Sequence, residues 1–133
     1  MKKRILVTGS TGFVGRQVIR ALTQQNIEFH LVIRKGREDE VSLWPNVSQV
    51  VSTLDLFSES TEWWAEQCDG VDTVVHLAWY AEPNNYLQSQ KNSDCLIGSL
   101  NLAKGAVKSG IRRFVGIGTC VEYDLSGGIL SVN

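Results

Sequence analysis

The chain has 133 residues, of which 43% are hydrophobic, and its formal net charge is −1 at pH 7. This balance fits one globular domain, residues 1–133, and argues against a disordered chain. There is no basic excess to attract nucleic acid, and no apolar run is long enough to span a membrane. The three cysteines, Cys68, Cys95 and Cys120, form no CxxC pair. We therefore expect reduced thiols, a cytoplasmic location and no metal site.

Apolar strand-like runs alternate with helix-like segments along the chain. Strands are predicted over residues 4–8, 28–34, 49–52, 73–78 and 113–118, and helices over residues 13–24, 58–67 and 87–109. A polar loop is predicted over residues 35–40. Apolar spacing in the first helix predicts a buried face made of Val14, Val18, Ala21 and Leu22. The same argument for the long last helix predicts a buried face of Leu96, Leu100, Ala103 and Val107.

Near-continuous apolar strands separated by helices predict an α/β fold with a parallel sheet covered on both faces. Because crossovers between parallel strands are right-handed, the expected topology is the doubly wound order 3-2-1-4-5. Ligands of such sheets bind beyond the carboxyl ends of the strands, next to the first strand.

A glycine-rich stretch, TGSTGFVG at residues 8–15, lies at that place. Gly9 allows a sharp turn out of the strand, and Gly12 lets a pyrophosphate approach the backbone. Gly15 lets the helix pack closely on the sheet. The plainer alternative is a strand-to-helix turn without a ligand, but the surrounding strand–helix–strand pattern favours a dinucleotide site.

The start of the first helix is expected to hold the phosphates. Free N–H groups around Gly12, Phe13 and Val14 point toward a bound anion at such a helix start. The hydroxyls of Ser10 and Thr11 can add further donors.

The end of the second predicted strand selects between the two dinucleotides. A carboxylate there binds the ribose hydroxyls of NAD, whereas an arginine can bind the 2′-phosphate of NADP. Arg34 stands at this end, with Lys35 and Arg37 close behind, and the acidic residues 38–40 come later. NADP is therefore the preferred prediction. NAD is the alternative, in which these cations belong to a solvated loop.

Five motifs in order resemble the extended branch of the short-chain dehydrogenase/reductase superfamily, which includes the NAD-dependent epimerases and dehydratases. They are TGSTGFVG at residues 8–15, DL at 55–56, DTVVHLA at 72–78, GSLNL at 98–102 and RFVGIGTCVEY at 113–123. The resemblance implies a Rossmann-type cofactor-binding domain that spans the whole chain.

The resemblance also implies roles for residues after the third and fourth strands. Asp55 would hydrogen-bond the adenine amino group and Leu56 would cover the ring, with a simple turn cap as the alternative for Asp55. Ala78 would line the nicotinamide-ribose side, next to Leu77 among the cofactor-binding residues. His30 is expected to be structural, and so is His76.

Catalysis in this branch uses a Ser or Thr, a Tyr, and a Lys four residues after that Tyr. Thr119 stands at the Ser/Thr position, where its hydroxyl would orient the substrate. Tyr123 is not the catalytic tyrosine, because Gly127 stands four residues later. The Tyr-x-x-x-Lys pair and the substrate domain are therefore expected beyond residue 133. The chain by itself is expected to bind cofactor without turnover.

The function implied by the resemblance is NAD(P)-dependent epimerisation, dehydration or reduction of a nucleotide-linked sugar, in a branch where homodimers are common. Two alternatives stay open. One is an atypical member of the superfamily that binds NADP as a sensor or scaffold without catalysis. The other is a Rossmann domain that functions as it stands.

Overall fold

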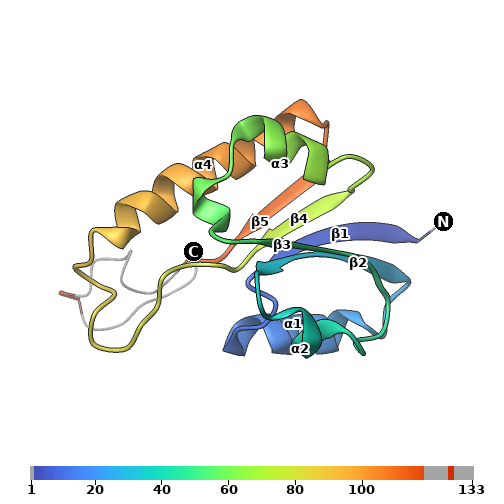
Figure 1. Cartoon of the computed structure of the whole chain (residues 1–133), viewed down its shortest axis with the longest axis horizontal. Helices are drawn as coiled ribbons and strands as arrows, with labels where there is room; N and C mark the ends of the chain where they lie inside the picture. The colour runs from blue at the N-terminus through green and yellow to red at the C-terminus, as the bar shows by residue number, and fades with distance from the viewer. Residues whose placement is uncertain (1, 119–125, 128–133) are drawn as a thin grey trace.

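A computed structural model describes residues 2–118 and 126–127, and it forms one parallel sheet with helices on both faces (Figure 1). The predicted order is confirmed, since the strands are arranged β3-β2-β1-β4-β5. They are β1 (Lys3–Thr8), β2 (Ile27–Arg34), β3 (Val47–Thr53), β4 (Thr73–His76) and β5 (Arg113–Gly116). β1 pairs with both β2 and β4, so its carboxyl end lies at the centre of one edge of the sheet.

Two helical layers cover the sheet (Figure 1). The helices are α1 (Phe13–Leu22), α2 (Glu38–Val41), α3 (Thr61–Gln67) and α4 (Lys91–Lys108), with a short 3-10 turn, η1 (Leu56–Ser58). One core contains Val7 and Leu31 packed with Ile19 of α1, and the other contains Leu6 packed with Trp64 and Leu102 of α3 and α4. Side chains alternate between the two faces of a strand, so burial of both faces explains the continuous apolar strands.

Three predicted boundaries are wrong for local reasons. The predicted loop over residues 35–40 contains the start of α2, whose first turn is acidic and so favours a helix N-terminus. The predicted helix over 58–67, for which Ser58 and Ser60 are the candidate N-caps, begins at Thr61, because the Ser60 hydroxyl accepts the N–H of Trp63 and caps α3. α4 begins at Lys91 rather than at residue 87, and the Ser89 hydroxyl accepts the N–H of Lys91 at this start.

The predicted buried face of α4 is also wrong. Leu96, Leu100 and Val107 are 54%, 51% and 77% exposed, and the helix instead buries Cys95, Gly98, Leu102, Gly105 and Ala106. The glycines determine this orientation, since a Cβ on Gly98 would lie 2.6 Å from Phe57 Cβ. A Cβ on Gly105 would lie 2.5 Å from Trp64 Cβ. Close approach of α4 to η1 and α3 therefore outweighs burial of the larger side chains.

The predicted face of α1 is correct in part. Val18 and Leu22 pack against the core, but Ala21 is exposed and the buried positions are Gly15 and Ile19. Val14 is exposed, because it lies in the first turn where the helix opens onto a cleft rather than onto the sheet.

Candidate functional site

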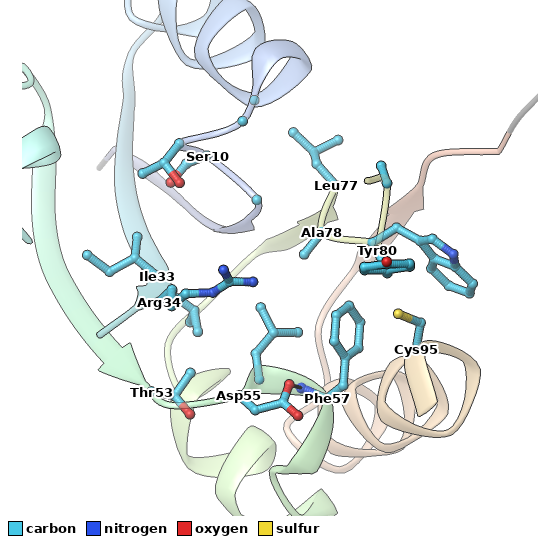
Figure 2. A pocket seen from close by; sticks show the side chains of 18 of the residues that line it. Ser10, Ile33, Arg34, Thr53, Asp55, Phe57, Leu77, Ala78, Tyr80 and Cys95 are labelled. Atoms are coloured by element: carbon cyan, nitrogen blue, oxygen red, sulfur yellow. Dashed lines mark hydrogen bonds between the residues drawn. The ribbon is translucent and has the colours of Figure 1, made fainter. Parts of the chain in front are cut away.

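A cleft of about 720 Å³ opens at the carboxyl ends of the central strands (Figure 2). Its volume is in the range of small-molecule sites. Every residue that the sequence predicts to bind the cofactor lines this cleft: Gly9, Ser10, Thr11, Gly12, Phe13, Val14, Gly15, Arg34, Asp55, Leu56, Leu77 and Ala78. Four separate stretches of the chain therefore meet in one place, as the topology predicts. Their contact with a cofactor stays a prediction.

The glycine turn between β1 and α1 forms one wall of the cleft. Gly9 has a φ of 71°, and a Cβ there would lie 2.6 Å from the backbone nitrogen of Ala78. Gly15 packs directly on the turn, since a Cβ there would lie 2.7 Å from Ser10 Cα. The Cβ of a residue at Gly12 would meet only the Gly9 carbonyl oxygen, at 3.4 Å. The turn thus needs Gly9 and Gly15 for packing, whereas Gly12 leaves its backbone open to the cleft.

The predicted hydroxyl donors of the turn differ in exposure. Ser10 is fully buried, and its Oγ has no hydrogen-bond partner among the described residues. Thr11 is half-buried, and its carbonyl oxygen accepts from Nε of Arg16 at 3.0 Å. Arg16 therefore supports the turn from the side of α1.

Two arginines lie at the β2 end of the cleft. Figure 2 shows the side chain of Arg34 reaching from the end of β2 into the cavity, and Arg37 also lines the cleft. Glu40 does not line it, because its carboxylate pairs with Arg16 at 2.7 Å and with Arg37 at 3.0 Å. Glu38 is turned back as well, and its carboxylate accepts the N–H of Gly36 at 2.8 Å. The charged side chains of this loop that line the cleft are therefore cationic: Arg34, and Arg37 in its ion pair with Glu40.

The side of the cleft that faces the glycine turn is formed by Asp55 and the residues around it (Figure 2). The carboxylate of Asp55 accepts the N–H of Phe57 at 3.0 Å and the hydroxyl of Ser58 at 2.8 Å. The turn cap that the sequence left open as an alternative is thus present. A carboxylate has lone pairs left after two such bonds, so the predicted bond to adenine stays a prediction.

Sequence reasoning assigned no cofactor role to several residues that line this side. Figure 2 places Phe57, Tyr80 and Cys95 around the space next to Asp55. Phe57 and Tyr80 could have been found from their positions just after the predicted third and fourth strands. Cys95 could not, because its place depends on which face of α4 packs inward.

His76 lies beneath the cleft at the end of β4, is buried, and has both ring nitrogens hydrogen-bonded, as expected for a structural histidine. Burial lowers its pKa to about 4. His30 of β2 is also buried, and burial together with nearby Arg4 lowers its pKa to about 4. The predicted catalytic residue, Thr119, lies outside the described residues.

Cys68 and Cys95 are both free and buried, in line with reduced thiols. Burial raises the pKa of Cys68 to about 11, so it is an unreactive thiol. In the described part of the chain, no three His, Cys, Asp or Glu side chains come together to hold a metal ion. Among the same residues, no helix is both long enough and apolar enough to cross a membrane.

The fold and this cleft define the class of protein: a doubly wound α/β domain with a glycine turn at a nucleotide-sized cleft. A model of the NAD dependent epimerase/dehydratase family matches residues 5–130. The chain therefore belongs to the NAD-dependent epimerase/dehydratase family, as the five motifs predict.

Individual proteins are similar to this chain in sequence or in fold. UDP-glucose 4-epimerase of Vibrio cholerae is 28% identical over 124 residues, covering 86% of this chain and 34% of that protein. The structure of UDP-N-acetylglucosamine 4-epimerase from Bacillus cereus has a TM-score of 0.72 at 23% identity, covering 95% of this chain and 42% of that one. The structure of the enzyme WbmG of Bordetella bronchiseptica in complex with NAD has a TM-score of 0.63 at 25% identity. The match covers 87% of this chain and 37% of that one. This chain thus spans about a third of the length of the curated relative it matches.

Proposed function

We propose that this chain binds NADP(H) in the cleft and binds NAD(H) less tightly. The observation that carries the proposal is the charge at the β2 end, where Arg34 and Arg37 line the cleft and the carboxylates of Glu38 and Glu40 do not. A 2′-phosphate would meet two guanidinium groups there, whereas the ribose hydroxyls of NAD would find no carboxylate from this loop. The glycine turn would hold the pyrophosphate at the start of α1.

Replacing Arg34 with aspartate tests the preference. The Kd for NADP should rise by about 30-fold or more, because a charge-assisted bond of about 2 kcal/mol is lost and a repulsive charge is added. The Kd for NAD should stay within about threefold, or fall as the new carboxylate meets the ribose hydroxyls. Titration calorimetry with both cofactors at one fixed salt concentration measures the two values.

Lys35→Asp is the matched control. Lys35 is the next residue, is exposed and does not line the cleft, so this change alters the net charge equally without touching the cavity. It should shift the Kd for NADP by no more than about threefold, since exposed charges are screened by salt. If Arg34→Asp left the ratio of the two Kd values unchanged, Arg34 would have no part in selection.

We further propose that the chain is the cofactor-binding part of an NADP(H)- or NAD(H)-dependent enzyme that acts on a nucleotide-linked sugar. Family membership and the epimerase relatives support this proposal. Thr119 would orient the substrate, and the proton would pass through a Tyr-x-x-x-Lys pair encoded after residue 133. The coding sequence that follows is the test, because absence of such a pair would favour the non-catalytic NADP-binding sensor. A homodimer stays a prediction.

A further inference from the structure

A chain of hydrogen bonds, buried at Thr8 and His76 and partly buried at Ser99, joins three elements beneath the cleft: β1, β4 and α4. Thr8 Oγ1 lies 2.7 Å from Nδ1 of His76, and Nε2 of His76 lies 2.7 Å from Oγ of Ser99. None of these three residues lines the cleft. The same Thr8 oxygen also accepts two backbone N–H groups, those of Leu77 and Ala78, each at 3.2 Å.

These two amide donors favour one direction for the hydrogen bonds in the chain. A hydroxyl oxygen has two lone pairs, and those of Thr8 accept from the two backbone N–H groups. With both amide hydrogens directed at this oxygen, the arrangement favours donation of its single hydroxyl proton to Nδ1 of His76, which leaves Nδ1 without a hydrogen. A neutral imidazole then has its hydrogen on Nε2, which donates to Oγ of Ser99. The low pKa of the buried ring keeps it neutral at pH 7.

Leu77 and Ala78, whose N–H groups the Thr8 hydroxyl accepts, form a wall of the cleft. It lies so close to the glycine turn that a Cβ on Gly9 would come within 2.8 Å of the carbonyl carbon of Leu77. β4 ends at His76, and the remaining backbone bond that joins this segment to β1 runs from the Leu77 N–H to the Thr8 carbonyl oxygen, at 3.2 Å. The Leu77 N–H is therefore shared between the carbonyl oxygen and the hydroxyl of Thr8, whereas the Ala78 N–H is held by the hydroxyl.

We propose that Ser99 and His76 are positioning residues for the dinucleotide cleft. Ser99 selects the tautomer of His76 in which Nδ1 is an acceptor, and His76 thereby keeps the Thr8 oxygen available to the amides of Leu77 and Ala78. If the hydrogen moved to Nδ1, it would compete for the lone pairs of Thr8 and weaken the bond from the Ala78 N–H, since the Leu77 N–H would keep the Thr8 carbonyl oxygen. The inference rests on the proposed cofactor site, although the tautomer is a property of the cofactor-free protein.

Replacing Ser99 with alanine is the main test. Nε2 of His76 would lose its partner, and the wall would no longer be held in its binding position. The Kd for NADP should rise about fivefold, which corresponds to one net hydrogen bond of about 1 kcal/mol. Ser99→Thr keeps the hydroxyl and should restore the Kd to within about twofold of the original value. Titration calorimetry on the three proteins measures the effect.

Ser109→Ala is the matched control on the same helix. It also removes one partly buried hydrogen bond, from Ser109 Oγ to the carbonyl oxygen of Ala65 at 2.6 Å, but at the end of α4 that does not line the cleft. It should lower the melting temperature and leave the Kd unchanged. Equal effects of Ser99→Ala and Ser109→Ala on the Kd would show that both serines only stabilise the fold, and the inference would be wrong.

The tautomer of His76 can be observed directly. Nitrogen NMR of the cofactor-free protein at pH 7 should show hydrogen on Nε2 and a bare Nδ1, and Ser99→Ala should populate both tautomers. Hydrogen on Nδ1 in the unmodified protein would overturn the inference. If the unmodified protein bound neither NADP nor NAD, the proposed function would fail while this spectrum still decided the tautomer.

Discussion

Replacing Gly15 with alanine should lower the free energy of unfolding by about 3 kcal/mol. The added methyl group would overlap the carbonyl oxygen of Gly9 and lie 2.7 Å from Cα of Ser10. Both neighbours are backbone atoms of the turn, so neither can move aside as a flexible side chain would. The helix start would have to shift away from β1, and the core around Ile19 of α1 would open with it. Urea unfolding followed by circular dichroism measures the loss.

Gly12→Ala separates packing from cofactor binding. The Cβ of an alanine there meets a single atom at 3.4 Å, and the φ of Gly12 is −77°, which any residue adopts. The variant should fold with its stability changed by less than about 1 kcal/mol. Its methyl group would project where the pyrophosphate approaches, so the Kd for NADP should rise about tenfold or more. Comparable stability losses in the two variants would contradict the geometry of the turn.

The local parts of the fold could be predicted because the signals lie close together in the sequence. The turn at residues 8–15 combines an apolar strand, three glycines and a helical pattern, and each of its predicted residues lines the cleft. The strand order followed from the alternation of elements and the handedness of crossovers. Arg34 was identified from its position at the end of a strand.

The orientation of α4 could not be predicted from periodicity. The stripe of Leu96, Leu100 and Val107 has helical spacing and is the more apolar choice. The helix nevertheless turns Gly98 and Gly105 inward, because only glycine allows its backbone to approach Phe57 and Trp64 so closely. Which face packs inward depended on the neighbours, and these come from a distant part of the sequence.

The long-range parts of the site were not predictable for the same reason. Thr8 and His76 are 68 residues apart, and Ser99 is a further 23 residues away, so no local pattern relates them. The sequence predicted His76 to be structural but could not name its partners. The ion pairs of Glu40 with Arg16 and Arg37 likewise depend on α2, a helix that the sequence placed in a loop.

Acid should destabilise the protein steeply between about pH 6.5 and pH 4. The pKa values of His30 and His76 are both lowered from 6.5 to about 4, mainly by burial. In this window the unfolded chain binds protons at both histidines and the folded chain does not, so stability falls as the pH falls. Each histidine should contribute about 1.4 kcal/mol per pH unit, or about 3 kcal/mol over the window. Such a loss is a large fraction of the stability of an ordinary domain.

Urea unfolding at a series of pH values, without cofactor, measures this dependence. His30→Gln removes one of the two titrating groups and leaves the Thr8–His76–Ser99 chain intact. Whatever its effect on stability at pH 7, this variant should show roughly half the slope of the free energy of unfolding against pH between pH 6.5 and pH 4. The pKa values of the exposed Glu38 and Glu62 carboxylates are lowered, chiefly by backbone hydrogen bonds, so their contribution is lost below about pH 4.5. A stability that stayed flat from pH 6.5 to pH 5 would show that neither histidine is held neutral by burial. It would also remove the support that the neutral ring gives to the proposed tautomer of His76.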